Sequence, residues 1–212
     1  MRLILAFLLL LTFSSIFAQD NWELRKDKDG IKVYTKQMDG YSIKGSKVTS
    51  VLETTISRIV AVMMDADNFY KLIPDSKSSK LLKAVSDNER IYYVSTDAPW
   101  PVTDRDGIYT MKFSQNPSSK VLTISVNCLP EYIPEKEDYV RVPRTEGTWK
   151  FTPLSNGKTE VFYQYVAEPG GSIPAWLANT SVVNMPFDTI KNLKERTAMK
   201  QYEGQTFSFL KN

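Results

Sequence analysis

The chain has 212 residues, of which 42% are hydrophobic and 12% aromatic, which is enough apolar material for a packed core and excludes intrinsic disorder. Its 27 basic and 24 acidic residues leave a net charge of +3, which is too weak to indicate a nucleic-acid partner. The absence of histidine and the single cysteine exclude Ser-His-Asp and Cys-His catalysis, histidine-ligated metal sites and an intramolecular disulfide. We therefore expect no metal site, and any catalysis would depend on carboxylates, lysine or tyrosine.

The first 18 residues have the pattern of a secretory signal peptide. Arg2 precedes an unbroken apolar run over Leu3–Leu11, and the small residue Ala18 stands near the end of the segment. Cleavage after Ala18 would leave a mature chain that starts at Gln19 and holds one domain over residues 20–212, exported to the periplasm or secreted. The alternative is an uncleaved N-terminal membrane anchor, although the apolar stretch is shorter than the roughly 20 residues that a spanning helix needs.

The first half of the mature chain has the pattern of three strands followed by two short helices. Asp29-Gly30 suits a tight hairpin turn between the first two strands. Ile56, Ile59 and Met63 recur at helical spacing and predict one apolar helix face. The expected strands are Trp22–Lys26, Ile31–Gln37 and Ile43–Val51, and the expected helices are Thr54–Asp65 and Ala66–Leu72.

The second half returns to strands and ends in one long helix. The segment Lys120–Cys128 alternates apolar and polar residues, which is typical of an antiparallel sheet. We expect Ser172 to cap a helix that runs from Ala175 to about Tyr202, with a kink at Pro186. The six expected strands are Lys80–Val85, Arg90–Thr96, Gly107–Ser114, Lys120–Cys128, Tyr139–Pro153 and Lys158–Glu168.

These elements predict an α+β fold of one domain. Nine antiparallel strands must bury one face, and the single long C-terminal helix is the only large partner for that face. A strongly curved nine-stranded sheet wrapped around this helix solves the packing problem. Such a sheet often encloses more volume than its own side chains fill, so we expect an internal cavity.

Two segments carry a resemblance to a known family. Residues 99–106 read PWPVTDRD, and residues 169–179 read PGGSIPAWLAN, before and within the start of the long helix. Trp22, the IKVY segment at Ile31–Tyr34 and the segment Gly147–Trp149 fit the same pattern. From Asn21 to Arg196 the chain resembles the START (steroidogenic acute regulatory protein-related lipid transfer) domain family, within the Bet v 1-like helix-grip superfamily.

The resemblance implies a helix-grip fold around one closed lipid-binding cavity. It implies binding or transfer of a sterol, phospholipid or sphingolipid, with no cofactor. It also implies that the loop holding Pro99–Thr103 and the C-terminal helix form a lid over the mouth of the cavity.

One departure from the family pattern concerns the polar interior. Sterol-binding members place an acidic residue and an arginine face to face inside the cavity. Here Met111 stands at the arginine position, six residues after Arg105, and Tyr92 stands at the acidic position. The expected cavity is therefore more apolar than that of the sterol-binding members, which weakens the case for cholesterol as the ligand. A flexible methionine suits an apolar ligand whose shape is not closely defined.

Alternation along the strands selects which side chains can face the concave side of the sheet. For each selected residue, plain core packing remains the alternative to cavity lining. A tyrosine hydroxyl in such a cavity can bind the single polar group of a lipid. The expected cavity residues are Tyr92, Val94, Met111, Phe113, Trp149, Phe151, Tyr163 and Tyr165 on strands, and Val183 and Phe187 on the long helix.

Five further residues need separate interpretations. Trp100 and Trp176 are expected at the lid or mouth, with local packing as the alternative. Arg105 and Asp106 are expected to fix the entrance of a strand by ion pairing, with a polar contact to the ligand from the cluster Asp104–Asp106 as the alternative. Cys128 lies on an apolar strand face and is expected to be a buried, inert thiol.

The leading functional hypothesis is a non-enzymatic lipid carrier or sensor, monomeric, outside the cytoplasm and in transient contact with a membrane surface. The second is a helix-grip enzyme, such as a cyclase or hydrolase acting on an apolar substrate, which would need an Asp, Glu, Lys or Tyr base inside the cavity. A third is an adaptor tethered by an uncleaved N-terminus.

Overall fold

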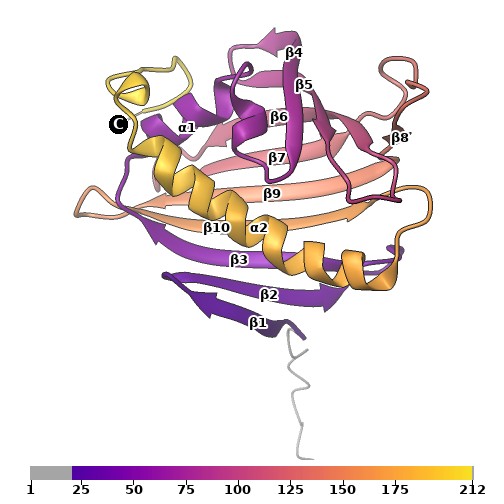
Figure 1. Ribbon diagram of the computed structural model, residues 1–212. Helices are drawn as coiled ribbons and strands as arrows, with labels where there is room; N and C mark the ends of the chain where they lie inside the picture. Colours follow the sequence, from indigo (N-terminus) through magenta and orange to yellow (C-terminus); the bar gives the residue numbers. More distant parts are fainter. Residues whose placement is uncertain (1–20, 212) are drawn as a thin grey trace, which may run out of the picture.

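The structure is a computed structural model that describes residues 21–211, so the expected signal peptide at residues 1–18 lies outside the described residues. A strongly curved sheet wraps around one long helix (Figure 1). The strand order across the sheet is β1-β2-β3-β10-β9-β7-β6-β5-β4, all antiparallel, and β8 pairs with β6 in parallel. The strands are β1 Glu23–Lys28, β2 Ile31–Gln37, β3 Lys44–Leu52, β4 Ser76–Ser86, β5 Glu89–Thr96, β6 Arg105–Gln115, β7 Leu122–Cys128, β8 Val140–Arg141, β9 Arg144–Pro153 and β10 Thr159–Glu168.

Four helical segments accompany the sheet: α1 Ile56–Met64, a 3-10 turn at Phe69–Lys71, α2 Ala175–Thr197 and a 3-10 turn at Lys200–Tyr202. Thr55 begins α1, where its hydroxyl accepts a hydrogen bond from the Arg58 amide at 3.5 Å. Within residues 21–211, no helix is both long enough and apolar enough to span a bilayer. The predicted α+β arrangement of a curved antiparallel sheet around a long C-terminal helix is confirmed.

The turn between β1 and β2 follows the sequence signal directly. Asp29 and Gly30 both have positive φ, at 54° and 74°. Two consecutive left-handed residues form the type I′ turn, whose twist matches that of the flanking strands. The hairpin register pairs Lys28 with Ile31 across this turn.

Within the described part of the chain, ten strands replace the nine that the sequence predicts, because the expected strand Tyr139–Pro153 is interrupted. Pro143 lies between β8 and β9 and has no N–H to donate to a sheet ladder. Val140 and Arg141 therefore pair with the start of β6, whereas Arg144 begins the pairing with β10.

Three helix boundaries also differ from the prediction. The expected helix Ala66–Leu72 is only a 3-10 turn, because the Ser79 hydroxyl bonds to the Ala66 carbonyl and accepts from the Tyr70 amide. The long helix ends at Thr197, and Met199 has extended backbone angles. Its N-cap is Pro174 rather than Ser172, and it has no side-chain capping bond.

The core lies where α2 crosses the concave face of the sheet. Phe187, Ile190 and Leu193 of α2 are buried in the same cluster as Val33 of β2 and Val48 of β3. Each such side chain contributes about 1.5–3 kcal/mol by leaving water. Figure 1 shows the start of α2 and the C-terminal segment at opposite ends of the molecule, so this core separates two different ends of the sheet.

Candidate functional site

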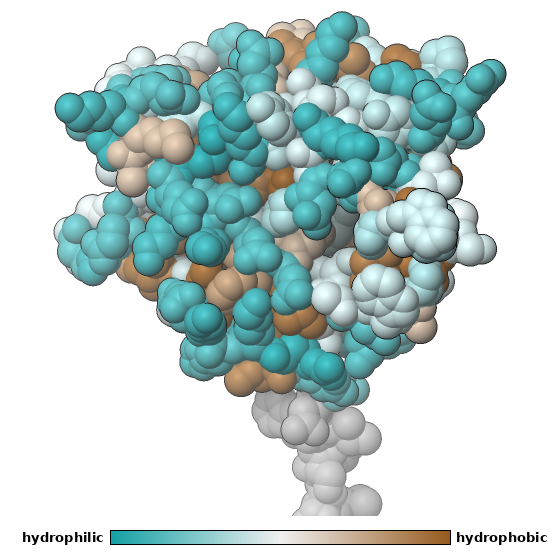
Figure 2. Space-filling view, in the orientation of Figure 1, coloured by the Kyte–Doolittle hydropathy of each residue, from teal (hydrophilic) through white to brown (hydrophobic). Residues whose placement is uncertain are grey.

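A cavity of about 290 Å³ lies between the concave face of the sheet, α2 and the loops that follow β5 and β10. Figure 2 shows hydrophilic side chains over most of the face that α2 crosses, with hydrophobic side chains visible between them. The α2 side of the cavity is formed by Leu177, Ala178, Ser181, Val182 and Met185, and the loops contribute Pro99, Val102 and Ile173.

The structure brings six of the ten expected cavity residues together around this space. They come from β5, β6, β9 and β10, which are neighbours on one side of the sheet together with β7. Met63, Phe69 and Leu72 from the α1 region close the same wall. The six are Tyr92, Val94, Met111, Trp149, Tyr163 and Tyr165.

The other four expected residues, Phe113, Phe151, Val183 and Phe187, do not line the cavity. The ring of Phe113 lies 5.7 Å from that of Phe209 in the C-terminal segment, which packs into that end of the core. On α2 the cavity-lining positions stop at Met185, so Phe187 packs directly on the sheet. Val182 rather than its neighbour Val183 lines the cavity, because adjacent helical residues point about 100° apart.

Trp100 and Trp176 lie beside the cavity rather than in it. Trp100 is 92% exposed and Trp176 is 62% exposed. Their chain neighbours Pro99 and Leu177 both line the cavity. The two indoles therefore project outward from the segments that border one end of the cavity.

Part of the cavity wall is formed by tyrosines and a tryptophan, aromatic side chains that each carry one polar group. The rings of Trp149 and Tyr163 stack with centroids 3.6 Å apart, and Tyr165 follows at 6.0 Å from Tyr163. Burial raises the pKa of Tyr163 well above its usual range and the pKa of Tyr165 to about 12. The Tyr92 hydroxyl instead donates to the Met63 carbonyl at 3.2 Å.

Alkaline pH should destabilise the protein through these tyrosines. A raised pKa means that the folded state keeps the phenol proton while the unfolded chain loses it near its usual pKa of about 10. The stabilisation is complete below about pH 10 and falls as the pH rises towards the folded-state value. Urea unfolding at pH 9 to 11 should show a falling midpoint, and Tyr163→Phe should make that fall shallower. An unchanged slope in the Tyr163→Phe variant would contradict this assignment.

Three consecutive charged residues at the start of β6 have three different environments. Asp104 forms an ion pair with the Lys77 ammonium at 2.5 Å, and its pKa is lowered chiefly by this hydrogen bond. Asp106 is buried and pairs with Arg141. Arg105, between them, forms no ion pair within the described residues, so of the two residues expected to pair at this strand entrance the structure pairs Asp106 and not Arg105.

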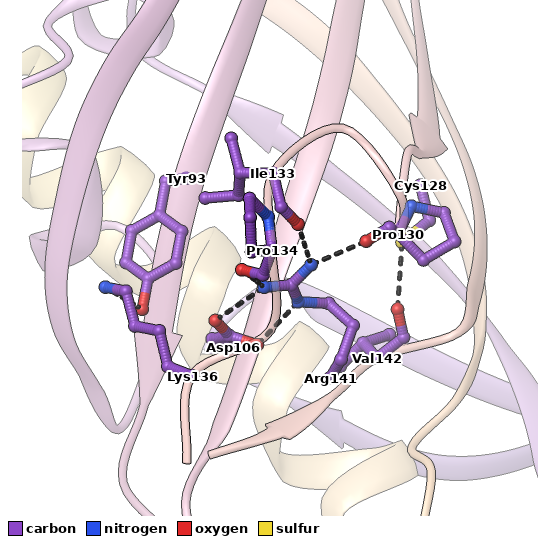
Figure 3. A network of polar contacts seen from close by, with 9 residues as sticks. All are labelled: Tyr93, Asp106, Cys128, Pro130, Ile133, Pro134, Lys136, Arg141 and Val142. Carbon is purple, nitrogen blue, oxygen red and sulfur yellow. Dashed lines mark hydrogen bonds and ion pairs between the residues drawn. The ribbon is translucent and has the colours of Figure 1, made fainter. Parts of the chain in front are cut away.

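The Arg141 guanidinium uses all five of its N–H donors (Figure 3). It donates to the Asp106 carboxylate from Nε at 2.7 Å and from Nη2 at 3.1 Å. The remaining donors bond to the carbonyls of Pro130, Ile133 and Pro134. This bidentate pair therefore fixes the segment between β7 and β8 onto the start of β6.

Cys128 lies beside this network (Figure 3). It is half-buried, and its thiol donates to the Val142 carbonyl at 3.1 Å. Burial raises the pKa of the thiol, which disfavours the nucleophilic thiolate.

Arg105 is 9% exposed and faces the cavity. Its guanidinium donates to the carbonyls of Thr103 and Gly170, the latter at 3.2 Å, and its buried Nε has no partner among residues 21–211. Burial lowers its pKa. The side chain thus connects the loop before β6 with the loop before α2 and leaves donors unused.

Sequence reasoning missed Arg141, Thr145 and the lining face of α2. The pairing of Arg141 with Asp106 spans 35 residues, and no spacing rule predicts it. The α2 positions had a usable signal, because Leu177, Ser181 and Met185 repeat every four residues.

Comparison with known proteins gives a consistent family relationship. A sequence profile of the START domain matches residues 17–203. An uncharacterized protein of Pseudomonas aeruginosa is 37% identical over 175 residues, covering 82% of this chain and 86% of its own length. The rat phosphatidylcholine transfer protein is 27% identical over 168 residues, covering 77% of this chain and 78% of its own.

Solved structures agree with the fold. A crystal structure of a StAR-related lipid transfer protein fragment from Xanthomonas axonopodis has a TM-score of 0.78 and 38% identity, covering 85% of this chain and 100% of that fragment. Human StAR-related lipid transfer protein 5 has a TM-score of 0.75 at 13% identity, covering 87% of this chain and 88% of that chain, which supports the fold alone.

Proposed function

Because the chain belongs to the START domain family, we propose that it binds one lipid in the cavity between the sheet and α2 and transfers it between membranes without changing it chemically. The single observation that carries this proposal is the cavity of about 290 Å³, whose wall is mostly apolar. Ligand pockets span about 300–1,000 Å³, so the observed space of about 290 Å³ lies just below the lower limit of that range. It suits one acyl chain, and a two-chain lipid would need the loops to open.

The driving force of binding is the removal of methylene groups from water. Each buried CH₂ contributes about 0.8 kcal/mol, so ten methylenes would supply about 8 kcal/mol. Met111, Tyr92 and Val94 offer dispersion contacts without an ion pair that a ligand must match. The phosphatidylcholine transfer proteins among the relatives support a phospholipid as the first lipid to test.

We infer no catalytic step. The carboxylates that border the cavity, Asp75 and Asp97, are exposed, and Asp97 pairs with Lys77 at 2.9 Å. The inner wall offers tyrosines whose pKa is raised by burial, which makes them poor bases near neutral pH.

Transfer between vesicles tests the proposal. Donor vesicles carrying a self-quenched fluorescent phosphatidylcholine and unlabelled acceptor vesicles are mixed with the protein. We expect a rate of dequenching that rises in proportion to protein concentration, and the fluorescent lipid should co-elute with the protein after the vesicles are removed. A rate equal to that without protein, together with no co-eluting lipid, would contradict the proposal.

We further propose that Trp100 and Trp176 enter the membrane interface when the lipid is exchanged, and that the loop at Pro99–Thr103 and the start of α2 act as the lid. Indole rings favour the boundary between hydrocarbon and water. Both indoles are exposed on segments that border the cavity.

Replacing both tryptophans with serine should weaken vesicle binding roughly tenfold, since burying part of an indole contributes about 1.5 kcal/mol or more. Co-sedimentation with vesicles measures the effect. Leu24→Ser is the control, because Leu24 is an exposed apolar residue on β1, outside the cavity lining. Equal binding by the double-serine variant and the unmodified protein would rule out this membrane contact.

A further inference from the structure

Two buried arginines a short distance apart in the fold differ in how many of their N–H donors form hydrogen bonds. Arg141 uses all five N–H donors, two of them on a carboxylate. Arg105 donates to two backbone carbonyls, and its Nε is buried without a partner. A buried guanidinium with unused donors is costly unless an anion completes it.

Resting on the proposed lipid-binding function, we propose that Arg105 binds the anionic group of the lipid, either a phosphate or a carboxylate, at the loop end of the cavity. The planar fork of an arginine suits both groups, because each presents two oxygens side by side. A neutral lipid such as a sterol or a diacylglycerol would leave the guanidinium unmatched.

The charges around Arg105 explain why the protein itself does not supply this anion. Asp104 is held by Lys77 at 2.5 Å, and Lys77 also contacts Asp97 at 2.9 Å. Asp106 is held by Arg141. Both carboxylates next to Arg105 in the sequence therefore already have a cationic partner. Within residues 21–211, no carboxylate forms an ion pair with Arg105.

Other polar groups face the same part of the cavity. Arg105, Gly107 and Tyr109 share one face of β6, because side chains alternate along a strand. A Cβ at Gly107 would collide with the phenol ring of Tyr109, so that ring lies along β6 over Gly107, towards Arg105. Glycine at this position is what allows the Tyr109 hydroxyl to lie near the polar end of the cavity.

Thr145 adds a buried hydroxyl to this end. It is 2% exposed, lines the cavity and lies close to the hydroxyls of Tyr109 and Tyr165. One anionic group with several lone pairs could accept from both Arg105 and Thr145. Apolar wall residues, including Leu72 and Met111, would surround the chain of the lipid.

Matched lipid pairs test the inference, because each pair differs only in the anionic group. The pairs are oleate with oleyl alcohol, and dioleoyl phosphatidate with dioleoylglycerol, each offered to the protein in neutral phosphatidylcholine vesicles. We expect the unmodified protein to take up the anionic member of at least one pair at least tenfold more than the neutral member. The pair that shows the preference identifies the source of the anion as a carboxylate or a phosphate.

Arg105→Gln should remove this preference while uptake of the neutral members stays within about threefold. Arg105→Lys should keep part of it, because the charge remains but the fork is lost. Arg25→Gln is the control for net charge, since Arg25 is exposed on β1 outside the cavity lining. If Arg105→Gln lowers uptake of both members equally, Arg105 acts only as a connection between the two loops and the inference is overturned.

A measurement on the unmodified protein covers the case in which Arg105→Gln does not fold. Carbon NMR of bound carboxyl-labelled oleate should give a carboxyl pKa below that of oleate in vesicles, because an adjacent guanidinium favours the ionised form. For the phosphate source, the unmodified protein is measured with and without 1 M salt. The salt should reduce its tenfold preference for phosphatidate over dioleoylglycerol by a smaller factor than it reduces binding to vesicles. Uptake of lipids with no preference for any anion overturns this inference alone, whereas no uptake of any lipid overturns the proposed function as well.

Discussion

Replacing Arg141 with methionine is expected to lower the free energy of unfolding by about 3–5 kcal/mol, because it leaves a buried carboxylate without its cation. The side chains of Arg141 and Asp106 are 3% and 0% exposed, so water cannot replace the lost partner. The same substitution also deprives the carbonyls of Pro130, Ile133 and Pro134 of their donor. Urea unfolding followed by circular dichroism measures the change.

Two further variants separate the charge effect from the carbonyl effect. Adding Asp106→Asn to Arg141→Met removes the uncompensated charge and should recover only part of the loss, because the three carbonyls stay unpaired. Arg144→Met is the control, since Arg144 is exposed and its pairing with Glu146 at 2.7 Å lies in water, where ion pairs stabilise little. A loss for Arg141→Met no larger than that for Arg144→Met would show that the buried network does not stabilise the fold.

Filling the cavity should weaken lipid binding strongly without unfolding the protein. Ala178 lies on the α2 face that lines the cavity. A tryptophan there would occupy space that the lipid needs, and because that space is a cavity, the overpacking cost of about 1–3 kcal/mol that a filled core imposes does not apply. We therefore expect Ala178→Trp to lower lipid affinity roughly 10- to 100-fold while its thermal midpoint stays the same or rises.

Asn179→Trp is the matched control for this prediction. Asn179 follows Ala178 on α2 but is exposed and outside the cavity lining. Equilibrium uptake of a fluorescent lipid should be retained in Asn179→Trp and lost in Ala178→Trp. Equal uptake by the two variants would place the bound lipid somewhere other than this cavity.

The fold could be predicted from the sequence because its signals are local. Alternation in β7 and the Asp29-Gly30 turn each depend on residues that are neighbours in the chain. The errors in the fold also have local causes: Pro143 divides one expected strand, and Ser79 holds the segment after α1 as a single 3-10 turn. Strand parity placed Met111 and Tyr163 on the concave face, and both line the cavity.

The rest of the site depends on contacts between distant segments, which periodicity does not encode. Phe113 has the right parity but lies at the end of β6 that Phe209 covers from the C-terminal segment. Asp106 pairs with Arg141, so Arg105 has no ion-pair partner among residues 21–211. Which of the adjacent charges at residues 104–106 pairs with which distant residue cannot be predicted from the sequence. The guanidinium of Arg105 is left facing the cavity.

Mass spectrometry of the purified protein under non-denaturing conditions tests the lipid-carrier account most directly. The account predicts a species heavier than the polypeptide by the mass of one lipid, either as purified or after incubation with vesicles of mixed lipids. The added mass should be released by collisional activation and be absent from Ala178→Trp treated in the same way. Polypeptide mass alone under both conditions, from protein whose folded state is verified by circular dichroism, would contradict the account.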